Sequence, residues 1–329
     1  MTDKINNSIQ GKKISIIIPC INEEKNINRT FDGLLEISNK HNLDFEIIAV
    51  DDGSKDGTWG VIKDYSSKHR NIIGIRHMSN FGQSCGYQSG FDNSTGDYVL
   101  TLSADLEIPL ENVVKVVEKL DEGYDFVNTN RVGRWGAEKA ERQQKSGIAN
   151  KIISKISGVH MKDRGSGLKG FTRILIDNFR LYGEMHRFIP DYLTVYGAKM
   201  TEFDVEFKDR DFGVSYYAGH KRTIKVILDL ATLAFMLYFA KKPFRAMPGR
   251  LFGFTGALFA GLGGFIGMYL VILKLFGQSI GDRPLLIASM MFVIVGVQML
   301  MTGMLGELMM RTYFESSGRK TYVVRQRLN

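Results

Sequence analysis

Two patterns of hydrophobic and polar positions follow each other repeatedly over residues 14–128, one typical of strands and one typical of helices. Short apolar runs typical of buried strands fall at Ile14–Ile18, Phe45–Val50, Ile72–Arg76, Tyr98–Leu102 and Phe126–Asn128. Stretches with a helical spacing of apolar residues separate them, at Glu23–Lys40, Thr58–Lys68, Gln83–Phe91 and Leu110–Leu120. Strands that alternate with helices at this pitch predict an α/β fold with a mostly parallel sheet covered on both faces.

The pattern changes toward the C-terminal end. Two apolar runs without a charged residue lie between Arg250 and Lys274 and between Arg283 and Glu307. Each is long enough for the roughly 20 residues that a helix needs to cross a bilayer. Glycines such as Gly256 would weaken a soluble helix, but they suit close helix packing in lipid. We therefore expect a C-terminal two-helix transmembrane hairpin.

Charge is distributed as unevenly as hydrophobicity. Residues 220–329 carry 14 basic and 4 acidic side chains, whereas residues 1–219 carry 29 basic and 31 acidic ones. Basic residues beside long apolar runs indicate an anionic membrane surface rather than nucleic acid. The positive-inside rule then places both termini in the cytoplasm, at the cytoplasmic (inner) membrane. The flanking residues are Lys241, Lys242, Arg245 and Arg250 before the first run, and Arg311, Arg319, Lys320, Arg325 and Arg327 after the second.

These patterns divide the chain into four segments. They are a cytosolic domain over 1–219, an amphipathic juxtamembrane helix and linker over 220–249, two transmembrane helices over 250–306 and a basic cytoplasmic tail over 307–329. The apolar residues of His220–Phe239 fit equally a helix on the membrane surface or one packed on the domain. The residues before Ile14 contain no apolar run long enough for a signal peptide. Cys20 and Cys85 stand far apart, which argues against a disulfide scaffold or a zinc finger.

Acidic and small residues follow three of the predicted strands, in the segments PCINEE (19–24), DDGSKDGT (51–58) and SADLE (103–107). In parallel sheets, ligands bind at the carboxyl ends of the strands. The sequence has neither GxGxxG nor GxxxxGK[ST], so we do not expect a dinucleotide or P-loop site. Carboxylates at this edge suit a hard divalent cation, which would bridge to the phosphates of a ligand.

In their order along the chain, PCINEE, VDDGSKDGT, the SNFG of Ser79–Gly82 and SADLE resemble a family-2, GT-A-type glycosyltransferase. With the terminal hairpin, the chain is similar to the polyprenyl-phosphate glycosyltransferases of the dolichol-phosphate mannose synthase, GtrB and ArnC type. The resemblance extends over nearly the whole chain, including GELMMRTYFE at Gly306–Glu315. It implies a GT-A domain with a Rossmann-like sheet.

The resemblance also implies a donor site for a nucleotide sugar such as a UDP- or GDP-sugar. Pro19, Asn22 and Glu23 would line the nucleotide pocket, and Asp52 would read the base or the ribose. The Asp-x-Asp-x-Gln metal motif of the family falls on Ser103, Asp105 and Glu107, a departure at two of three places. Asp105 and Glu107 are the expected ligands of Mg²⁺ or Mn²⁺, while Ser103 offers only a hydroxyl.

Further positions are implied for the acceptor and the donor sugar. Arg131, Arg142 and Ser146 resemble the site for the acceptor phosphate, and a spacing of four puts the last two on one helix face. Asp163 and Ser166 match the D-x-x-S-G segment beside the donor sugar. Arg210 is similar to the arginine that closes on the donor diphosphate, although Tyr216 stands where a lysine is usual. His186 and Arg187 fit either a sugar contact or a protein surface. We expect Asp105, Arg131, Arg142, Ser146 and Arg210 to carry catalysis.

These residues predict transfer of a sugar to polyprenyl phosphate, undecaprenyl phosphate in a bacterium, with inversion at the anomeric carbon. An anionic phosphate needs positive charge and in-line geometry rather than a general base. Relatives imply a homo-oligomer, for which a tetramer is one candidate form. A non-catalytic sugar-nucleotide-binding scaffold stays open because of Ser103, as does transfer to another lipid hydroxyl with Asp163 as base. A processive polysaccharide synthase is disfavoured, because its QxxRW motif has Arg131 in place of glutamine.

Overall fold

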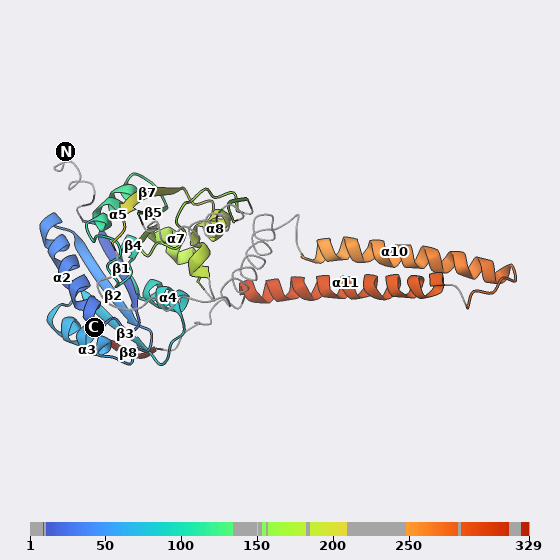
Figure 1. Ribbon diagram of the computed structural model, residues 1–329, viewed down its shortest axis with the longest axis horizontal. Coiled ribbons are helices and arrows are strands. Elements are labelled where there is room, and N and C mark those ends of the chain that lie inside the picture. The colour runs from blue at the N-terminus through green and yellow to red at the C-terminus, as the bar shows by residue number, and fades with distance from the viewer. Residues whose placement is uncertain are drawn as a thin grey trace. The chain divides into compact units, whose positions relative to one another are not determined.

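The computed structural model describes residues 9, 11–133, 150, 153–155, 157–181, 185–208, 248–281, 284–315 and 324–328. The chain divides into two compact units. One comprises Met1–Ala234 together with Lys320–Asn329, and the other Phe235–Arg319. The first is an α/β unit and the second holds the two long apolar helices (Figure 1). The stretch His220–Phe239, for which an amphipathic helix is predicted, lies outside the described residues.

An eight-stranded sheet forms the centre of the α/β unit, in the order β7-β5-β6-β4-β1-β2-β3-β8. Pairing is parallel between β1 and β2, β1 and β4, β2 and β3, and β5 and β7. β6 runs antiparallel to β4 and β5, and β8 antiparallel to β3. The strands are β1 (Lys13–Cys20), β2 (Asp44–Asp51), β3 (Ile72–His77), β4 (Tyr98–Thr101), β5 (Phe126–Val132), β6 (Lys169–Thr172), β7 (Met200–Glu206) and β8 (Val324–Leu328).

Helices lie on both faces of this sheet, which confirms the predicted fold class (Figure 1). The α-helices of the unit are α2 (Glu24–His41), α3 (Thr58–Lys68), α4 (Gln83–Asn93), α5 (Asn112–Asp121), α7 (Arg173–Asn178) and α8 (Ile189–Leu193). The 3-10 helices are η2 (Met185–Phe188) and η3 (Thr194–Tyr196). The five predicted strands and four predicted helices are present with ends shifted by a few residues, whereas β6, β7 and β8 were not predicted. β8 lies within the predicted basic tail, and its pairing with the edge strand β3 is a long-range contact that leaves no local signal.

The two faces of β1 are covered differently. Ile14, Ile16 and Ile18 pack into one hydrophobic core with the apolar faces of α2, α3 and α5. Ile17 points to the opposite face, where α4 lies so close that a Cβ at Gly90 would overlap it. The glycines that weaken α4 as an isolated helix therefore allow its backbone to approach the sheet.

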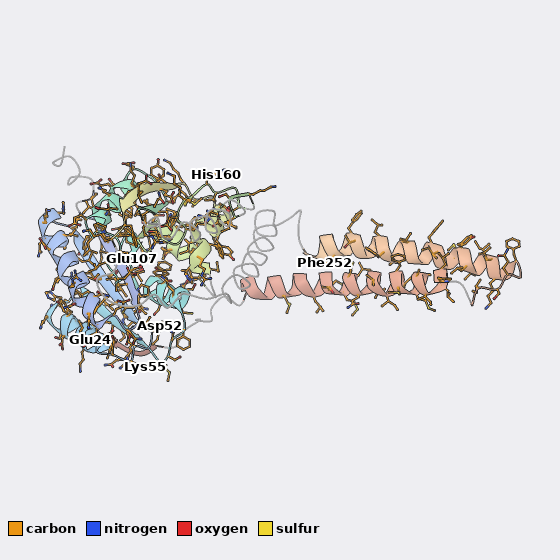
Figure 2. The ribbon with its side chains drawn as sticks, viewed as in Figure 1. Glu24, Asp52, Lys55, Glu107, His160 and Phe252 are labelled. Carbon is orange, nitrogen blue, oxygen red and sulfur yellow. The ribbon has the colours of Figure 1, made fainter. Side chains whose placement is uncertain are left out.

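The second unit consists of α10 (Pro248–Leu275) and α11 (Pro284–Glu315). Within them, Phe252–Leu275 and Pro284–Gly306 are long and apolar enough to cross a membrane. The helices touch through small residues: a Cβ at Gly296 would lie 2.7 Å from the carbonyl oxygen of Gly256, and Ser289 Oγ donates to the Gly263 carbonyl at 2.8 Å. Large side chains project away from the pair (Figure 2). This is the arrangement expected of helices surrounded by lipid.

Candidate active site

The predicted site segments meet at one edge of the sheet. β1, β2, β4, β5 and β7 all point their carboxyl ends to this edge, because β6 is antiparallel to both β4 and β5. For the same reason, the segment 163–168 that leads into β6 lies there too. The three acidic segments thus share one edge of the sheet, as predicted, and the Asp163–Gly167 segment lies at the same edge.

The loops after β1 and β2 are joined by hydrogen bonds. Asn22 adopts a left-handed backbone with φ 56°, which asparagine tolerates better than most residues. Its amide donates to Ser54 Oγ and its Oδ1 accepts from the Lys55 amide, both at 2.9 Å. The Glu23 amide donates to Thr58 Oγ1 at 2.9 Å. The predicted nucleotide residues Asn22 and Glu23 thus belong to a loop pair with a defined shape, at the carboxyl end of β1 where Pro19 lies.

Asp52 is buried, and its carboxylate is used by the protein itself. Oδ1 accepts from the Phe81 amide at 2.9 Å and contacts His77 Nδ1 at 2.8 Å, while Oδ2 accepts from the Gly82 amide at 2.8 Å. Asp52 therefore anchors the segment that begins α4, beside which it lies (Figure 2). Asp52 is predicted to read the base or the ribose of a nucleotide. In this structure the three protein contacts occupy that carboxylate, so a nucleotide would have to share it or displace one of them.

The turn after β4 carries the predicted metal ligands. Leu106 stands between Asp105 and Glu107 with φ 55°, a backbone conformation that is strained for leucine. Such strain is concentrated at functional sites. Both carboxylates are partly exposed, and oxygen donors of this kind suit Mg²⁺ or Mn²⁺. Within the described ranges, no group of three or more His, Cys, Asp or Glu side chains could hold a metal. At this turn a cation bound to Asp105 and Glu107 would need its remaining ligands from water or from another bound molecule.

Ser103 is packed against the neighbouring loop. A Cβ added to Gly167 would overlap the Ser103 hydroxyl, so the two residues are in direct contact. An aspartate at position 103 would carry two more heavy atoms into this contact. The departure from the metal motif therefore agrees with the packing here, and Ser103 is placed to support the 163–167 loop.

Two hollows of different size adjoin this turn. A hole of about 10 Å³, lined by Ser103, Asp105, Glu107, Arg131 and apolar neighbours, is at the lower limit for one water molecule. A cleft of about 400 Å³ lies between α2 and the residues 105–111, with Arg29, Lys40 and Lys208 on its walls. Among the described residues, Asp105 borders both hollows. Asp105 is thus the predicted ligand with space on two sides.

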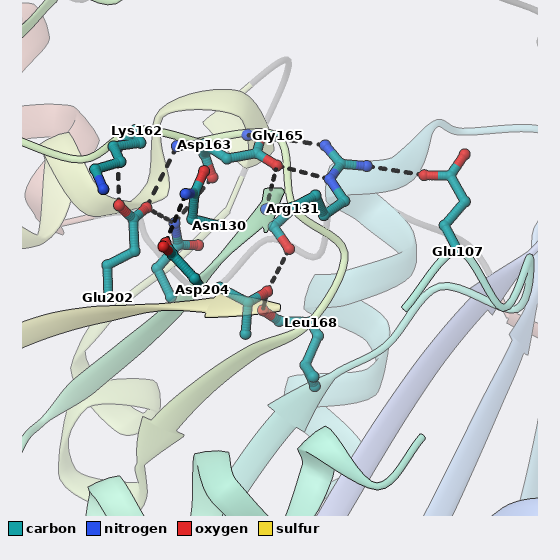
Figure 3. A network of polar contacts seen from close by, with 12 residues as sticks. Glu107, Asn130, Arg131, Lys162, Asp163, Gly165, Leu168, Glu202 and Asp204 are labelled. Atoms are coloured by element: carbon teal, nitrogen blue, oxygen red, sulfur yellow. Dashed lines mark hydrogen bonds and ion pairs between the residues drawn. The ribbon is translucent and has the colours of Figure 1, made fainter. Parts of the chain in front are cut away.

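Arg131 is held between two carboxylates. Its Nε donates to Asp163 Oδ2 at 2.6 Å, its Nη2 to Asp163 Oδ1 at 3.1 Å, and its Nη1 to Glu107 Oε2 at 2.8 Å (Figure 3). Burial lowers the pKa of the guanidinium, but Asp163, Glu107 and Asp105 outweigh it and raise the pKa overall. Arg131 is predicted to lie at the acceptor phosphate. In this structure it bridges β5 to both the metal turn and the 163–167 loop.

The two residues predicted at the donor sugar face inward. The Asp163 carboxylate accepts from Arg131 and, at 3.1 Å, from the Gly165 amide. Ser166 is 2% exposed and shares a hydrogen bond with the Thr129 hydroxyl. Ser166 would therefore have to leave its partner to contact a sugar, whereas the Asp163 carboxylate is partly exposed.

Three polar residues of the site were not identified from the sequence. Asn128 on β5 is fully buried, and Glu202 on β7 accepts from it at 2.7 Å. Lys169 on β6 donates to the Ser166 carbonyl, and burial lowers the pKa of its amine to about 7. A signal for Glu202 was present, because acidic residues alternate with apolar ones from Glu202 to Phe207, a pattern typical of a strand with one acidic face.

The structure describes His186 but not three of the residues that are predicted at the site. Arg142, Ser146 and Arg210 lie outside the described residues. His186 Nδ1 is 2.9 Å from the hydroxyl of Ser84, which belongs to the first turn of α4. This contact ties η2 to α4.

Comparisons with known proteins extend these findings. Residues 15–180 match the model of the family described as Glycosyl transferase family 2. The chain is 31% identical to a dodecaprenyl-phosphate galacturonate synthase of Rhizobium johnstonii, with 98% of this chain and 94% of that protein aligned. It is 30% identical to an undecaprenyl-phosphate 4-deoxy-4-formamido-L-arabinose transferase of Aeromonas hydrophila, over 97% and 95% of the two chains.

Solved structures share the fold at low sequence identity. Mannosyl-3-phosphoglycerate synthase from Rubrobacter xylanophilus aligns with a TM-score of 0.54 at 17% identity, over 73% of this chain and 78% of that one. Glucosyl-3-phosphoglycerate synthase from Mycobacterium tuberculosis, solved with Mn²⁺ and UDP-glucose, aligns with a TM-score of 0.53 at 16% identity, over 72% and 83%. At these identities the likeness bears on the fold alone.

Proposed function

The chain belongs to glycosyl transferase family 2, and on that premise we propose that it transfers a sugar from a nucleotide-sugar donor to a polyprenyl phosphate. The observation that carries the proposal is the extent of the similarity. Both polyprenyl-phosphate relatives align over at least 97% of this chain, a span that takes in the apolar helices as well as the α/β unit. Undecaprenyl phosphate is the proposed acceptor in a bacterial host, and a UDP- or GDP-sugar the proposed donor.

The chemistry requires one displacement. An oxygen of the acceptor phosphate attacks the anomeric carbon, the bond from that carbon to the donor diphosphate breaks, and the nucleoside diphosphate leaves with the electron pair. Configuration is inverted. The acceptor is already an anion, so no side chain has to remove a proton. The protein has to hold two anionic groups in line and offset their repulsion.

Residues at the strand ends are proposed for these tasks. Asp105 and Glu107 would hold Mg²⁺ or Mn²⁺, which neutralises charge on the departing diphosphate when bound. Pro19, Asn22 and Glu23 would border the nucleotide. Arg131 contributes positive charge beside the metal turn while it remains paired with Asp163 and Glu107. Arg142, Ser146 and Arg210 keep their proposed roles at the acceptor phosphate and the donor diphosphate.

The apolar helices are proposed to anchor the enzyme where its acceptor resides. A polyprenyl tail is confined to the bilayer, so its phosphate is accessible only at the membrane surface. Basic residues flank both apolar runs, which favours cytoplasmic termini and a cytoplasmic active site. A homo-oligomer in the membrane, with a tetramer as the first possibility to test, completes the proposal.

A transfer assay tests this function directly. Detergent-purified protein is incubated with undecaprenyl phosphate, Mg²⁺ or Mn²⁺ and radiolabelled UDP-, GDP- or dTDP-sugars, and label extracted into organic solvent is counted. We expect metal-dependent label in the lipid phase for one donor class. Asp105→Ala should reduce the rate by at least about 100-fold, because it removes a ligand of the cation. Asp44→Asn is the matched control, since Asp44 is an exposed acid at the opposite end of β2.

Other outcomes would redirect the proposal. Nucleotide binding by folded protein without lipid-linked label from any donor would contradict transfer and favour a scaffold. Label that depends on a lipid alcohol instead of undecaprenyl phosphate would identify a different acceptor.

A further inference from the structure

Two asparagine–acid pairs lie next to each other across β5 and β7. In the parallel register Asn128 is opposite Glu202 and Asn130 is opposite Asp204. Each asparagine donates its Nδ2 to the carboxylate at 2.7 Å, so the two pairs have the same local chemistry (Figure 3). Their surroundings differ, because Asn128 is fully buried while Asp204 is exposed.

The inner pair also holds a loop. Glu202 Oε2 accepts from the Lys162 amide at 2.9 Å, and Oε1 accepts from the Asp163 amide at 3.3 Å. Asn128 Nδ2 donates its second hydrogen to the Asp163 carbonyl at 2.9 Å. The backbone of Asp163 is thus fixed on both sides by side chains from β5 and β7.

The fixed Asp163 in turn orients Arg131. Its two carboxylate oxygens accept from Nε and Nη2 of the guanidinium, which leaves Nη1 directed at Glu107. A bidentate pair of this kind sets the plane of a guanidinium as well as its position. Polar contacts therefore run without interruption from Glu202 on β7 to Glu107 in the metal turn (Figure 3).

The burial of the Asn128 side-chain carbonyl has an energetic cost. The Asn128 Oδ1 atom is buried, and no donor within the described residues bonds to it. A buried carbonyl oxygen without a donor is destabilising, because it has lost its hydrogen bonds to water and gained none in return. Reversing the amide would place Oδ1 against two acceptor oxygens and lose both hydrogen bonds. Uncompensated polar groups in an otherwise consistent fold are expected at functional positions.

We propose that Glu202 is a positioning residue of sugar transfer: with Asn128 it fixes Asp163, which orients Arg131 toward Glu107. The catalytic consequence rests on the proposed function, because Glu107 and Arg131 matter to rate only if this edge of the sheet is the transfer site. The geometric consequence, the position of Arg131, does not depend on the reaction.

Paired variants test the catalytic consequence. Glu202→Gln retains the side-chain size but replaces one carboxylate oxygen with an NH₂ group. In wild type each of the two oxygens accepts from an N–H donor, so in the variant one donor would face another donor. We expect kcat to fall by at least about tenfold, as is common for residues that orient site ligands, with little change in KM for the donor. Asp204→Asn makes the same chemical change one register step away and should match wild type in both constants. Equal losses in the two variants would overturn the proposal.

A double-mutant cycle tests whether Glu202 acts through Asp163. In an Asp163→Asn background, Glu202→Gln should cause no further fall in kcat, because the residue it positions is already impaired. Losses that multiply would show that Glu202 acts independently, which contradicts the proposal. Thermal melting of each variant confirms that folded proteins are compared.

An NMR measurement reports on the position of Arg131 without any reaction. In wild type, the Arg131 Nε–H signal, assigned through Arg131→Lys, should exchange slowly with solvent because Nε donates to Asp163. Glu202→Gln should accelerate that exchange, whereas Asp204→Asn should not. An unchanged signal in Glu202→Gln overturns the positioning. If Glu202→Gln accelerates the exchange but the wild-type protein has no transferase activity, the positioning role of Glu202 stands and the proposed function is refuted.

Discussion

The two units of this chain are built with opposite distributions of residue size. In the α/β unit, large side chains such as Phe31 and Phe45 are buried at 0% and 1% exposure between helices and sheet. In the helical unit, Gly256, Gly263 and Gly296 form the contact between the helices, while Phe265 is 75% exposed. In the first unit, the hydrophobic effect drives large apolar side chains into the interior. Lipid offers no such force, so the helices of the second are held by close packing of small residues.

Close packing through glycine also occurs inside the α/β unit. Gly86 and Gly90 bring α4 against Pro19 and Ile17 of β1. There the obstacle to a larger residue is a side chain, whereas at Gly296 it is the backbone of Ala260 and Gly256. The Ile17 side chain can change rotamer, whereas a helix backbone cannot, so the glycine contacts of α10 and α11 are less tolerant than the one at Gly90.

The largest expected effect on stability comes from creating a cavity in the core of the α/β unit. Phe31→Ala removes a fully buried ring that packs against Tyr65 at a centroid distance of 5.0 Å. It should lower the free energy of unfolding by about 3–5 kcal/mol. Denaturant unfolding followed by tryptophan fluorescence measures this, because both tryptophans of the chain, Trp59 and Trp135, precede the apolar helices. Phe265→Ala, a ring removed from the outer surface of α10, should leave this transition unchanged; a comparable loss there would break the distinction between the units.

A smaller effect is expected from filling the contact between the apolar helices. Gly296→Val places side-chain atoms against the backbone of α10 and should destabilise the helix pair by about 1–3 kcal/mol. Gly264→Val is the control, since nothing lies within 4 Å of a Cβ at that position. Disulfide cross-linking between cysteines introduced on the facing sides of α10 and α11 should be lost in the first variant and retained in the second. Equal cross-linking in both would contradict the glycine contact.

The smallest change, when taken per pH unit, is expected from pH, to which the two units should respond differently. The apolar runs contain no Asp, Glu, His, Cys, Lys or Arg, whereas burial lowers the pKa of Lys169 to about 7 in the α/β unit. Between about pH 7 and 10 the unfolded chain binds the proton that the folded unit has released, so stability rises with pH by at most about 1.4 kcal/mol per unit. The groups facing Lys169 are Asp163, Arg131 and Glu202.

Lys169→Met should flatten this rise. The free energy of unfolding from tryptophan fluorescence, measured at several pH values in this window, provides the comparison. An identical slope in the variant would mean that Lys169 stays protonated in the folded protein.

Much of the fold could be predicted because its signals are local. The apolar run Phe45–Val50 and the helical spacing of apolar residues in Thr58–Lys68 are each contained in a short stretch of chain, and the structure confirms both elements with little or no shift of their ends. β6 spans four residues and β8 lies in a charged tail, so neither has a periodic signal of its own. Both are strands because a neighbouring edge supplies hydrogen-bond partners.

The sequence by itself determined the α/β class, the acidic strand ends and the two apolar helices, since these depend on residue order over short distances. The tertiary structure alone decided what each polar side chain contacts. Arg131 and Asp163 stand 32 positions apart, and Glu202 is a further 39 positions along the chain. Their partnership follows from the pairing of β5 with both β6 and β7, and no spacing along the chain encodes it. Hydrogen bonds act over about 3 Å of space, so only the folded sheet could show that Arg131 and Asp163 bind each other.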